Sequence, residues 1–308
     1  MKYTLYILLL FFGIGTAQNS DFHSEDLSIT SLIDGTLLTP DINKKMPLAI
    51  IIGGSGPTDR DGNQQMMKNN SLKFLAEGLY KKEIASFRYD KRIVKQMNNK
   101  SIDEKNIHFG DFIEDAVAVL NYFKKDKRFS KIYIIGHSQG SLVGMVAAQE
   151  GADGFISIAG AGQEIDDVII DQLAKQAPGL VDNARMSFDD LRANGVSYNY
   201  NPGLASIFRK EIQPFIFSWM LYNPQEEIVK IESPVLIING DNDIQVQISE
   251  AALLQEAKPN AEYKIIPNMN HIFKEVEGND LENSKTYNQF DLPVMPELIN
   301  LIADFIKK

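Results

Sequence analysis

The chain has 308 residues, a length ordinary for one α/β domain, and carries a formal net charge of −10. An acidic chain without a basic stripe cannot neutralise phosphates, so the composition argues against nucleic-acid binding. The chain contains no cysteine, which excludes disulfides, a cysteine nucleophile and a cysteine-ligated metal site.

The first 17 residues are typical of a cleavable signal peptide. Lys2 precedes an apolar run at residues 5–14, and small residues end this segment just before Gln18. The run is well short of the ~20 residues that a membrane-spanning helix needs, and no cysteine follows it to carry a lipid. We therefore predict export to the periplasm or the extracellular medium, no stable membrane anchor, and a mature domain at residues 18–308.

Short apolar runs that alternate with helical segments predict an α/β fold. Loose alternation over residues 26–40 predicts two antiparallel strands joined near Asp34 and Gly35. Runs of apolar, often β-branched residues predict buried strands at 47–52, 84–89, 132–135 and 154–160. Periodicity near 3.6 predicts helices at 71–82 and 112–123. The polar stretch from Val94 to Phe109 is interpreted as a loop.

A glycine-rich loop at residues 53–63 follows the first of these buried strands. It lacks the Gly-Lys-Ser/Thr end of a phosphate-binding loop, and Gln64 and Asn70 stand where a calcium loop of EF-hand type needs Gly and Glu. Glycines let a backbone approach a ligand closely. We therefore expect backbone N–H groups of this loop, from Gly54 or Ser55, to point into a site.

The charged run Arg88-Tyr89-Asp90-Lys91-Arg92 closes the next predicted strand. We interpret it as a solvated loop with internal ion pairs.

A G-x-S-x-G pattern at residues 136–140 lies between a predicted strand and a small-residue helix at 142–148. Glycines on both sides of Ser138 allow the strand to turn directly into the helix. Such a turn lifts the serine oxygen beside a helix N-terminus, whose free N–H groups can receive an oxyanion. The pattern alone is common, but this context predicts that Ser138 is a nucleophile.

The second half of the chain repeats the alternation, with strands predicted at 234–239 and 262–266 and helices at 247–257 and 296–308. About 70 residues separate the strand ending at Gly160 from the next one, whereas a crossover needs little more than a dozen. We predict a mainly helical cap insertion over residues 163–230. Its aromatic side chains either line a substrate cleft or only pack the insertion onto the body.

A serine nucleophile needs a base, and the base works best when a carboxylate fixes its tautomer. Of the four histidines, only His271 follows a predicted strand in a loop, where sites form in open α/β sheets. Asp243 also follows a strand, and we assign it the orienting role. Asp241 is expected to bond its own backbone in an Asx turn. Ser138, Asp243 and His271 come in the chain order of this architecture.

The sequence resembles the α/β-hydrolase superfamily across nearly the whole mature chain. The segments that carry the resemblance are residues 136–140, 240–246 and 270–271. The loop at 53–63 and the run at 88–92 also resemble a bacterial branch of secreted acyl esterases, with dienelactone-hydrolase-like and serine-aminopeptidase-like members. In that branch Gly-x-Gly commonly follows the basic run, whereas Ile93-Val94-Lys95 follows it here.

The resemblance implies an α/β-hydrolase fold with a mostly parallel central sheet, helices on both faces and a helical cap. It also implies a Ser-His-Asp hydrolase of small-molecule acyl esters that needs no cofactor and no metal. The expected oxyanion donors are the backbone N–H of Gln139 and one from Gly54 or Ser55. A peptidase or amidase on the same fold is the main alternative, and a non-catalytic binding protein is another. The sequence makes no prediction of oligomeric state.

Overall fold

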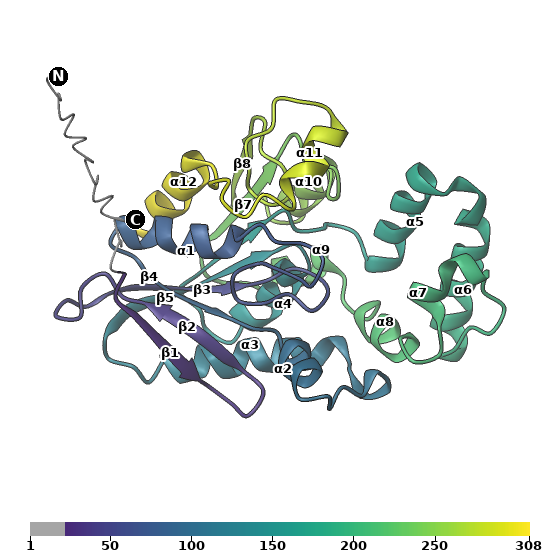
Figure 1. Ribbon diagram of the computed structural model, residues 1–308, viewed down its shortest axis with the longest axis horizontal. Coiled ribbons are helices and arrows are strands. Elements are labelled where there is room, and N and C mark those ends of the chain that lie inside the picture. The colour runs from purple at the N-terminus through teal and green to yellow at the C-terminus, as the bar shows by residue number, and fades with distance from the viewer. Residues whose placement is uncertain (1–21) are drawn as a thin grey trace, which may run out of the picture.

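The computed structural model describes residues 22–308, so the predicted signal peptide lies outside the described residues. One eight-stranded sheet of order β1-β2-β4-β3-β5-β6-β7-β8 runs through the molecule (Figure 1). The strands are β1 (Ser24–Ser28), β2 (Asp34–Leu38), β3 (Met46–Ile52), β4 (Ala85–Tyr89), β5 (Phe129–His137), β6 (Gly154–Ile158), β7 (Val235–Gly240) and β8 (Glu262–Ile266). From β4 to β8 all neighbours pair in parallel, whereas β1 and β2 extend one edge in antiparallel pairing.

Helices cover both faces of the sheet (Figure 1). On one face, α1 (Ser71–Lys81) and α12 (Pro296–Ile306) share a core with the strands. A second core on the other face involves α3 (Phe109–Phe123), α4 (Gln139–Ala148), α9 (Pro224–Val229) and α10 (Ile248–Ala257). This arrangement confirms the predicted α/β-hydrolase fold class. No helix within residues 22–308 is long and apolar enough to cross a membrane.

The connection between β6 and β7 is a helical insertion, here defined as residues 163–230. It contains α5 (Ile165–Gln176), η2 (Pro178–Leu180), α6 (Val181–Asn194), η3 (Pro202–Leu204), α7 (Ala205–Phe208), α8 (Gln213–Trp219) and α9. Helices α5 to α8 stand beside the carboxyl ends of the parallel strands, at the right of Figure 1. Phe188, Leu191 and Phe208 belong to a small apolar core of this insertion. A separate core lets the insertion form a wall without taking side chains from the main body.

The turn between β1 and β2 differs from the sequence prediction. Asp34 and Gly35 begin β2 rather than forming the turn, and the chain reverses at residues 29–33. The hydroxyl of Thr30 accepts the backbone N–H groups of Leu32 at 3.2 Å and Ile33 at 3.1 Å. A threonine turn therefore takes the place expected for Asp-Gly.

The predicted loop at residues 94–109 is wrong over part of its length. Helix α2 (Arg92–Asn98) and the 3-10 turn η1 (Glu104–Asn106) occupy much of it. The Arg92 guanidinium anchors the start of α2 on α3, because it contacts Asp111 at 2.9 Å and Asp115 at 2.7 Å. The short α11 (Asp280–Thr286), also not predicted, begins with Asn279 accepting the N–H groups of its first turn. Local caps and long-range ion pairs stabilise these short helices. Apolar periodicity in the sequence therefore does not predict them.

Candidate active site

Ser138 occupies a sharp turn between β5 and α4. Its backbone has φ 55° and ψ −123°, a region that costs energy for a residue with a side chain. A Cβ on Gly136 would lie 2.3 Å from the Gly140 carbonyl oxygen, and one on Gly140 would lie 2.5 Å from the Ile52 carbonyl oxygen. Both glycines are therefore required by the close packing, and the turn has the strain typical of a nucleophile elbow.

His271 and Asp243 form a buried pair beyond the ends of β8 and β7. The His271 Nδ1 lies 2.7 Å from Asp243 Oδ2, and both side chains are buried. The other carboxylate oxygen of Asp243 accepts the backbone N–H groups of Gln245 at 2.8 Å and Val246 at 2.9 Å. Because the ionised carboxylate only accepts, Nδ1 of His271 carries the proton and Nε2 is free to act as a base.

The remaining predicted site residues gather around Ser138. Ser138 and His271 line one small polar pocket of about 50 Å³, together with Gly54 and Ser55. A Cβ on Gly54 would lie 3.3 Å from the Ser138 Cβ, so the glycine-rich loop passes directly beside the serine. Gln139 is the first residue of α4. The predicted site residues that the structure brings together are Ser138, Asp243, His271, Gln139, Gly54 and Ser55.

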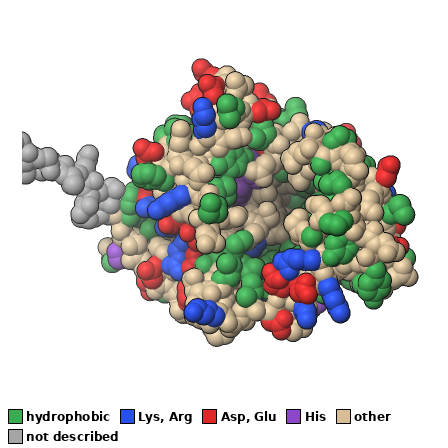
Figure 2. Space-filling view, turned by 45° about the vertical axis from the view of Figure 1, so that its right-hand side comes forward, with side chains coloured by type: hydrophobic (Ala, Val, Ile, Leu, Met, Phe, Trp, Pro, Cys, Tyr) green, Lys and Arg blue, Asp and Glu red, His purple; other side chains and the backbone are tan. Residues whose placement is uncertain are grey.

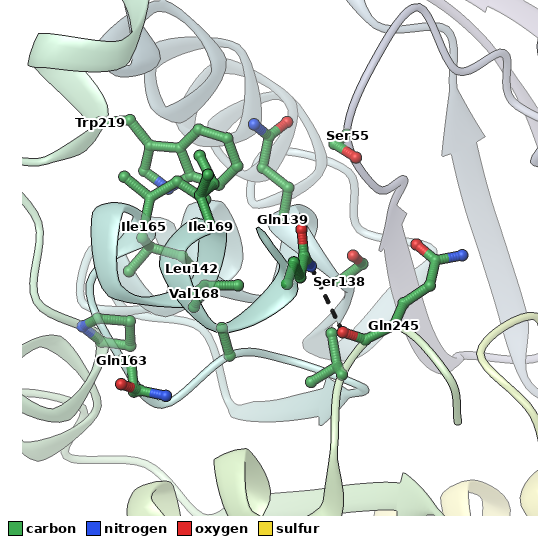
Figure 3. Close-up of a pocket in the computed structure, with 14 residues that line it drawn as sticks. Ser55, Ser138, Gln139, Leu142, Gln163, Ile165, Val168, Ile169, Trp219 and Gln245 are labelled. Carbon is green, nitrogen blue, oxygen red and sulfur yellow. Dashed lines mark hydrogen bonds between the residues drawn. The ribbon is translucent and has the colours of Figure 1, made fainter. Parts of the chain in front are cut away.

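A larger and mainly apolar cavity of about 260 Å³ opens on the other side of Ser138. Figure 3 shows Leu142, Ile165, Ile169 and Trp219 on one side of this cavity and Ser138 near the opposite side. The space-filling view has a hollow between the main body and the helical insertion (Figure 2). Within residues 22–308, no Asp, Glu, Lys or Arg lines this cavity or the small polar pocket.

Solved structures of similar fold support this description. Est1E from Butyrivibrio proteoclasticus has a TM-score of 0.59 and 19% identity, covering 92% of this chain and 99% of that one. The Pyrococcus furiosus esterase Pf2001 has a TM-score of 0.57 and 16% identity over 99% and 98% of the two chains. A dienelactone hydrolase from Anabaena variabilis has a TM-score of 0.51 and 14% identity over 93% and 96%. The chain therefore has the α/β-hydrolase fold.

Among curated proteins, this chain is similar to Esterase EstD from Thermotoga maritima. The two are 27% identical over 274 residues, which cover 83% of this chain but 61% of EstD. The chain therefore spans about three fifths of the length of that relative. No family model matches the chain.

His137 takes part in the site in a way that sequence reasoning missed. Its Nε2 donates to the backbone carbonyl of His271 at 2.9 Å, and the two rings lie 4.8 Å apart. Burial, together with the nearby His271, lowers the pKa of His137 to about 3. A neutral His137 therefore holds the loop that carries His271. Its place inside the elbow was the available signal, but a contact with a residue far along the chain cannot be read from sequence.

The interpretation of residues 88–92 as a solvated loop is wrong for Arg88 and Lys91. Arg88 lies within β4 and is buried, and Lys91 is buried as well. Burial lowers the pKa of Lys91 to about 7, although the nearby Asp115 acts in the opposite direction. The Lys91 ammonium reaches the glycine-rich loop and Gln139. A charged run in the sequence signals solvent exposure by default, so this inward-pointing lysine was missed.

The Asx turn predicted at Asp241 is also wrong. Its carboxylate accepts the backbone N–H of Asn268, 27 residues away, at 2.7 Å. Asp243 makes the local bonds to the two following N–H groups in addition to its bond with His271. Asp241 thus ties the strand end to the loop that leads to His271.

Proposed function

We propose that this protein, which has the α/β-hydrolase fold, is a serine carboxylic-ester hydrolase that works through an acyl-enzyme. The observation that carries the proposal is the buried Asp243–His271 pair, at 2.7 Å, beside a serine in a strained elbow. This combination matches the roles of nucleophile, base and orienting carboxylate. The similarity to Esterase EstD supports an ester as the substrate.

The proposed reaction has two halves. Ser138 Oγ attacks the ester carbonyl while His271 Nε2 takes its proton, and Asp243 stabilises the resulting imidazolium. The negative charge that develops on the carbonyl oxygen accepts hydrogen bonds from Gln139 N–H and from a backbone N–H of the glycine-rich loop. His271 then gives its proton to the leaving alcohol. Water attacks the acyl-enzyme by the same route, which releases the acid and restores Ser138.

The two pockets suggest where each part of the substrate binds. The alcohol must leave beside His271, and the pocket there, of about 50 Å³, is the smaller of the two. The acyl group then occupies the apolar cavity of about 260 Å³. A cavity of ~150 Å³ holds benzene, so by proportion this one accepts about ten non-hydrogen atoms. We propose esters of medium-length apolar acids with small alcohols.

The peptidase or amidase alternative is disfavoured by the lining of the two pockets. An aminopeptidase binds a charged amino terminus, and a carboxypeptidase binds a charged carboxylate. Neither pocket has an Asp, Glu, Lys or Arg side chain among the described residues that line it. Uncharged pockets suit neutral esters better because a buried unpaired charge is costly.

A substrate panel tests this function. The protein should hydrolyse the ethyl esters of butanoic and octanoic acid. It should show no measurable activity on p-nitroanilides of amino acids. Anilide hydrolysis at a rate equal to ester hydrolysis would favour the amidase, and no hydrolysis of any ester would overturn the proposal.

We also propose that the protein acts outside the cytoplasm after loss of residues 1–17. The support is the positive start, short apolar run and small residues of that segment. The intact mass of the exported protein should correspond to a chain that begins at Gln18. A mass that retains the first 17 residues would contradict cleavage.

A further inference from the structure

Lys91 lies just beyond β4, at the back of the candidate oxyanion site. Its side chain is 5% exposed. The ammonium donates to the Gly54 carbonyl oxygen at 2.9 Å and to Gln139 Oε1 at 2.6 Å, and it lies 4.4 Å from the centre of the Phe112 ring. A buried ammonium is rare unless its donors are used. Two of the contacts go to the two segments that supply the proposed oxyanion donors.

The bond to Gly54 fixes the direction of a particular N–H group. The Gly54 carbonyl and the Ser55 N–H belong to one peptide unit, and no cis peptide occurs in the described chain. In a trans peptide these two groups point in opposite directions. Lys91 therefore turns the Ser55 N–H away from itself, and Ser55 lines both pockets that Ser138 lines.

Two further hydrogen bonds hold the carbonyl group of Ser55. Its carbonyl oxygen accepts from the Thr58 hydroxyl at 2.9 Å and from Gln64 Nε2 at 2.8 Å. In the part of the chain that the structure describes, no protein group accepts the Ser55 N–H. The peptide is thus anchored on both sides of a donor that is left free for a substrate oxygen.

The bond to Gln139 fixes the second donor segment. Gln139 is the first residue of α4, so its backbone N–H has no partner within the helix. The Gln139 side chain accepts from the same ammonium that holds Gly54. One buried lysine side chain therefore links the glycine-rich loop to the start of α4.

We propose that Lys91 is a positioning residue that sets the spacing and direction of the oxyanion donors Ser55 N–H and Gln139 N–H. This inference rests on the proposed ester hydrolysis, and it selects Ser55 over Gly54 as the loop donor. The hydrogen bond from Lys91 Nζ to the Gly54 carbonyl also polarises that peptide, which makes the Ser55 N–H a stronger donor. Lys91 acts through these backbone groups and does not touch the substrate.

Lys91→Met removes the donors while keeping an unbranched side chain of similar length. Because the oxyanion forms only in the transition state, we expect kcat to fall on the order of 10- to 100-fold, with KM within about twofold of wild type. Affinity for a trifluoromethyl ketone, whose tetrahedral adduct carries an oxyanion, should fall by the same factor as kcat/KM.

Lys274→Met is a matched control for the loss of a buried lysine side chain. Lys274 is also fully buried, donates to a backbone carbonyl, that of Leu292, and lies 4.7 Å from the centre of the Phe74 ring. Its ammonium touches neither oxyanion segment. This variant should lose melting temperature while keeping its kcat and ketone affinity.

The two variants are compared after ester hydrolysis by the wild type has been measured. An inactive wild type would overturn the proposed function and, with it, this inference. Loss of kcat and of ketone affinity in Lys91→Met, but not in Lys274→Met, supports the positioning role. A Lys91→Met protein that folds and keeps both values within about twofold of wild type overturns it, as does a loss that lies entirely in KM. If Lys91→Met does not fold, Lys91→Gln is measured in the same way and judged by the same outcomes.

Discussion

The main body and the helical insertion contribute to the cleft in different ways. Body residues are held by polar bonds, as when Asp243 accepts two neighbouring backbone N–H groups and pairs with the side chain of His271, 28 residues away. The insertion contributes mainly apolar surface, including Ile165, Ile169 and Trp219 (Figure 3). Proton transfer and charge stabilisation need fixed directions, whereas an acyl chain needs only a matching shape. Changes in the body should therefore reduce turnover for every ester, and changes in the insertion should alter preference among esters.

Replacing the proposed nucleophile is the strongest test of the body. Ser138→Ala should lower kcat on the order of 10⁴-fold or more for every ester, because no covalent intermediate forms. The melting temperature should stay close to that of the wild type, since alanine removes only an oxygen. Stopped assays with the ethyl esters of butanoic and octanoic acid measure the effect. Residual turnover above one tenth of wild type would remove Ser138 from the mechanism.

Substitutions of the two carboxylates after β7, Asp241 and Asp243, should separate effects on catalysis from effects on stability. Asp243→Asn should lower kcat by up to ~10⁴-fold, because an amide can hold His271 in the wrong tautomer. Asp241→Asn weakens the bond to the Asn268 N–H and should reduce melting temperature with little change in kcat. Kinetics and thermal melts of both variants give the comparison. Exchange of the two phenotypes would move the orienting role to Asp241.

A substitution of Trp219 tests whether the insertion sets the preference among esters. Its ring stacks on Phe109 at 5.3 Å and lines the apolar cavity. Trp219→Ala should enlarge that cavity and raise the dodecanoate-to-butanoate ratio of kcat/KM on the order of tenfold. Phe217→Ala, in the same helix but packed against the core of the insertion, is the control and should leave the ratio unchanged. Equal proportional losses on all esters in Trp219→Ala would mean that Trp219 only supports the fold.

The smallest effect is expected where the two regions meet at the surface. Arg209 of the insertion pairs with Glu104 of the body, and both side chains are 37% exposed. Exposed pairs contribute about 0–1 kcal/mol, so Glu104→Gln should change the free energy of unfolding by at most about 1 kcal/mol. Ester preference should not change. Denaturant unfolding and the ester panel measure both, and a shifted preference would show that this contact sets the shape of the cavity.

The sequence predicted the repeating elements well and the long-range polar contacts poorly. The elbow glycines and the buried strands have local signatures, because steric fit and apolar periodicity are written in neighbouring residues. The roles of Lys91 and His137 depend on partners far along the chain, at Gln139 and His271. A charged run such as 88–92 is exposed in most proteins, so only the folded structure reveals that Lys91 points inward.

The insertion shows the same limit. Its existence followed from the excess length between two buried strands, but the side chains that face the cleft depend on how its short helices pack. Trp219 was one of several aromatic candidates in the sequence. Its stacking on Phe109 and its place on the cavity wall come from tertiary packing.

The central claim is that Ser138 forms the covalent intermediate, and reaction with a fluorophosphonate tests it most directly. The intact mass should increase by one phosphonyl group, and peptide mapping should place that group on Ser138 in the wild type. The Ser138→Ala variant should take up none. A modification at another residue, such as Ser55 in the glycine-rich loop, or equal labelling of the variant, would contradict the account.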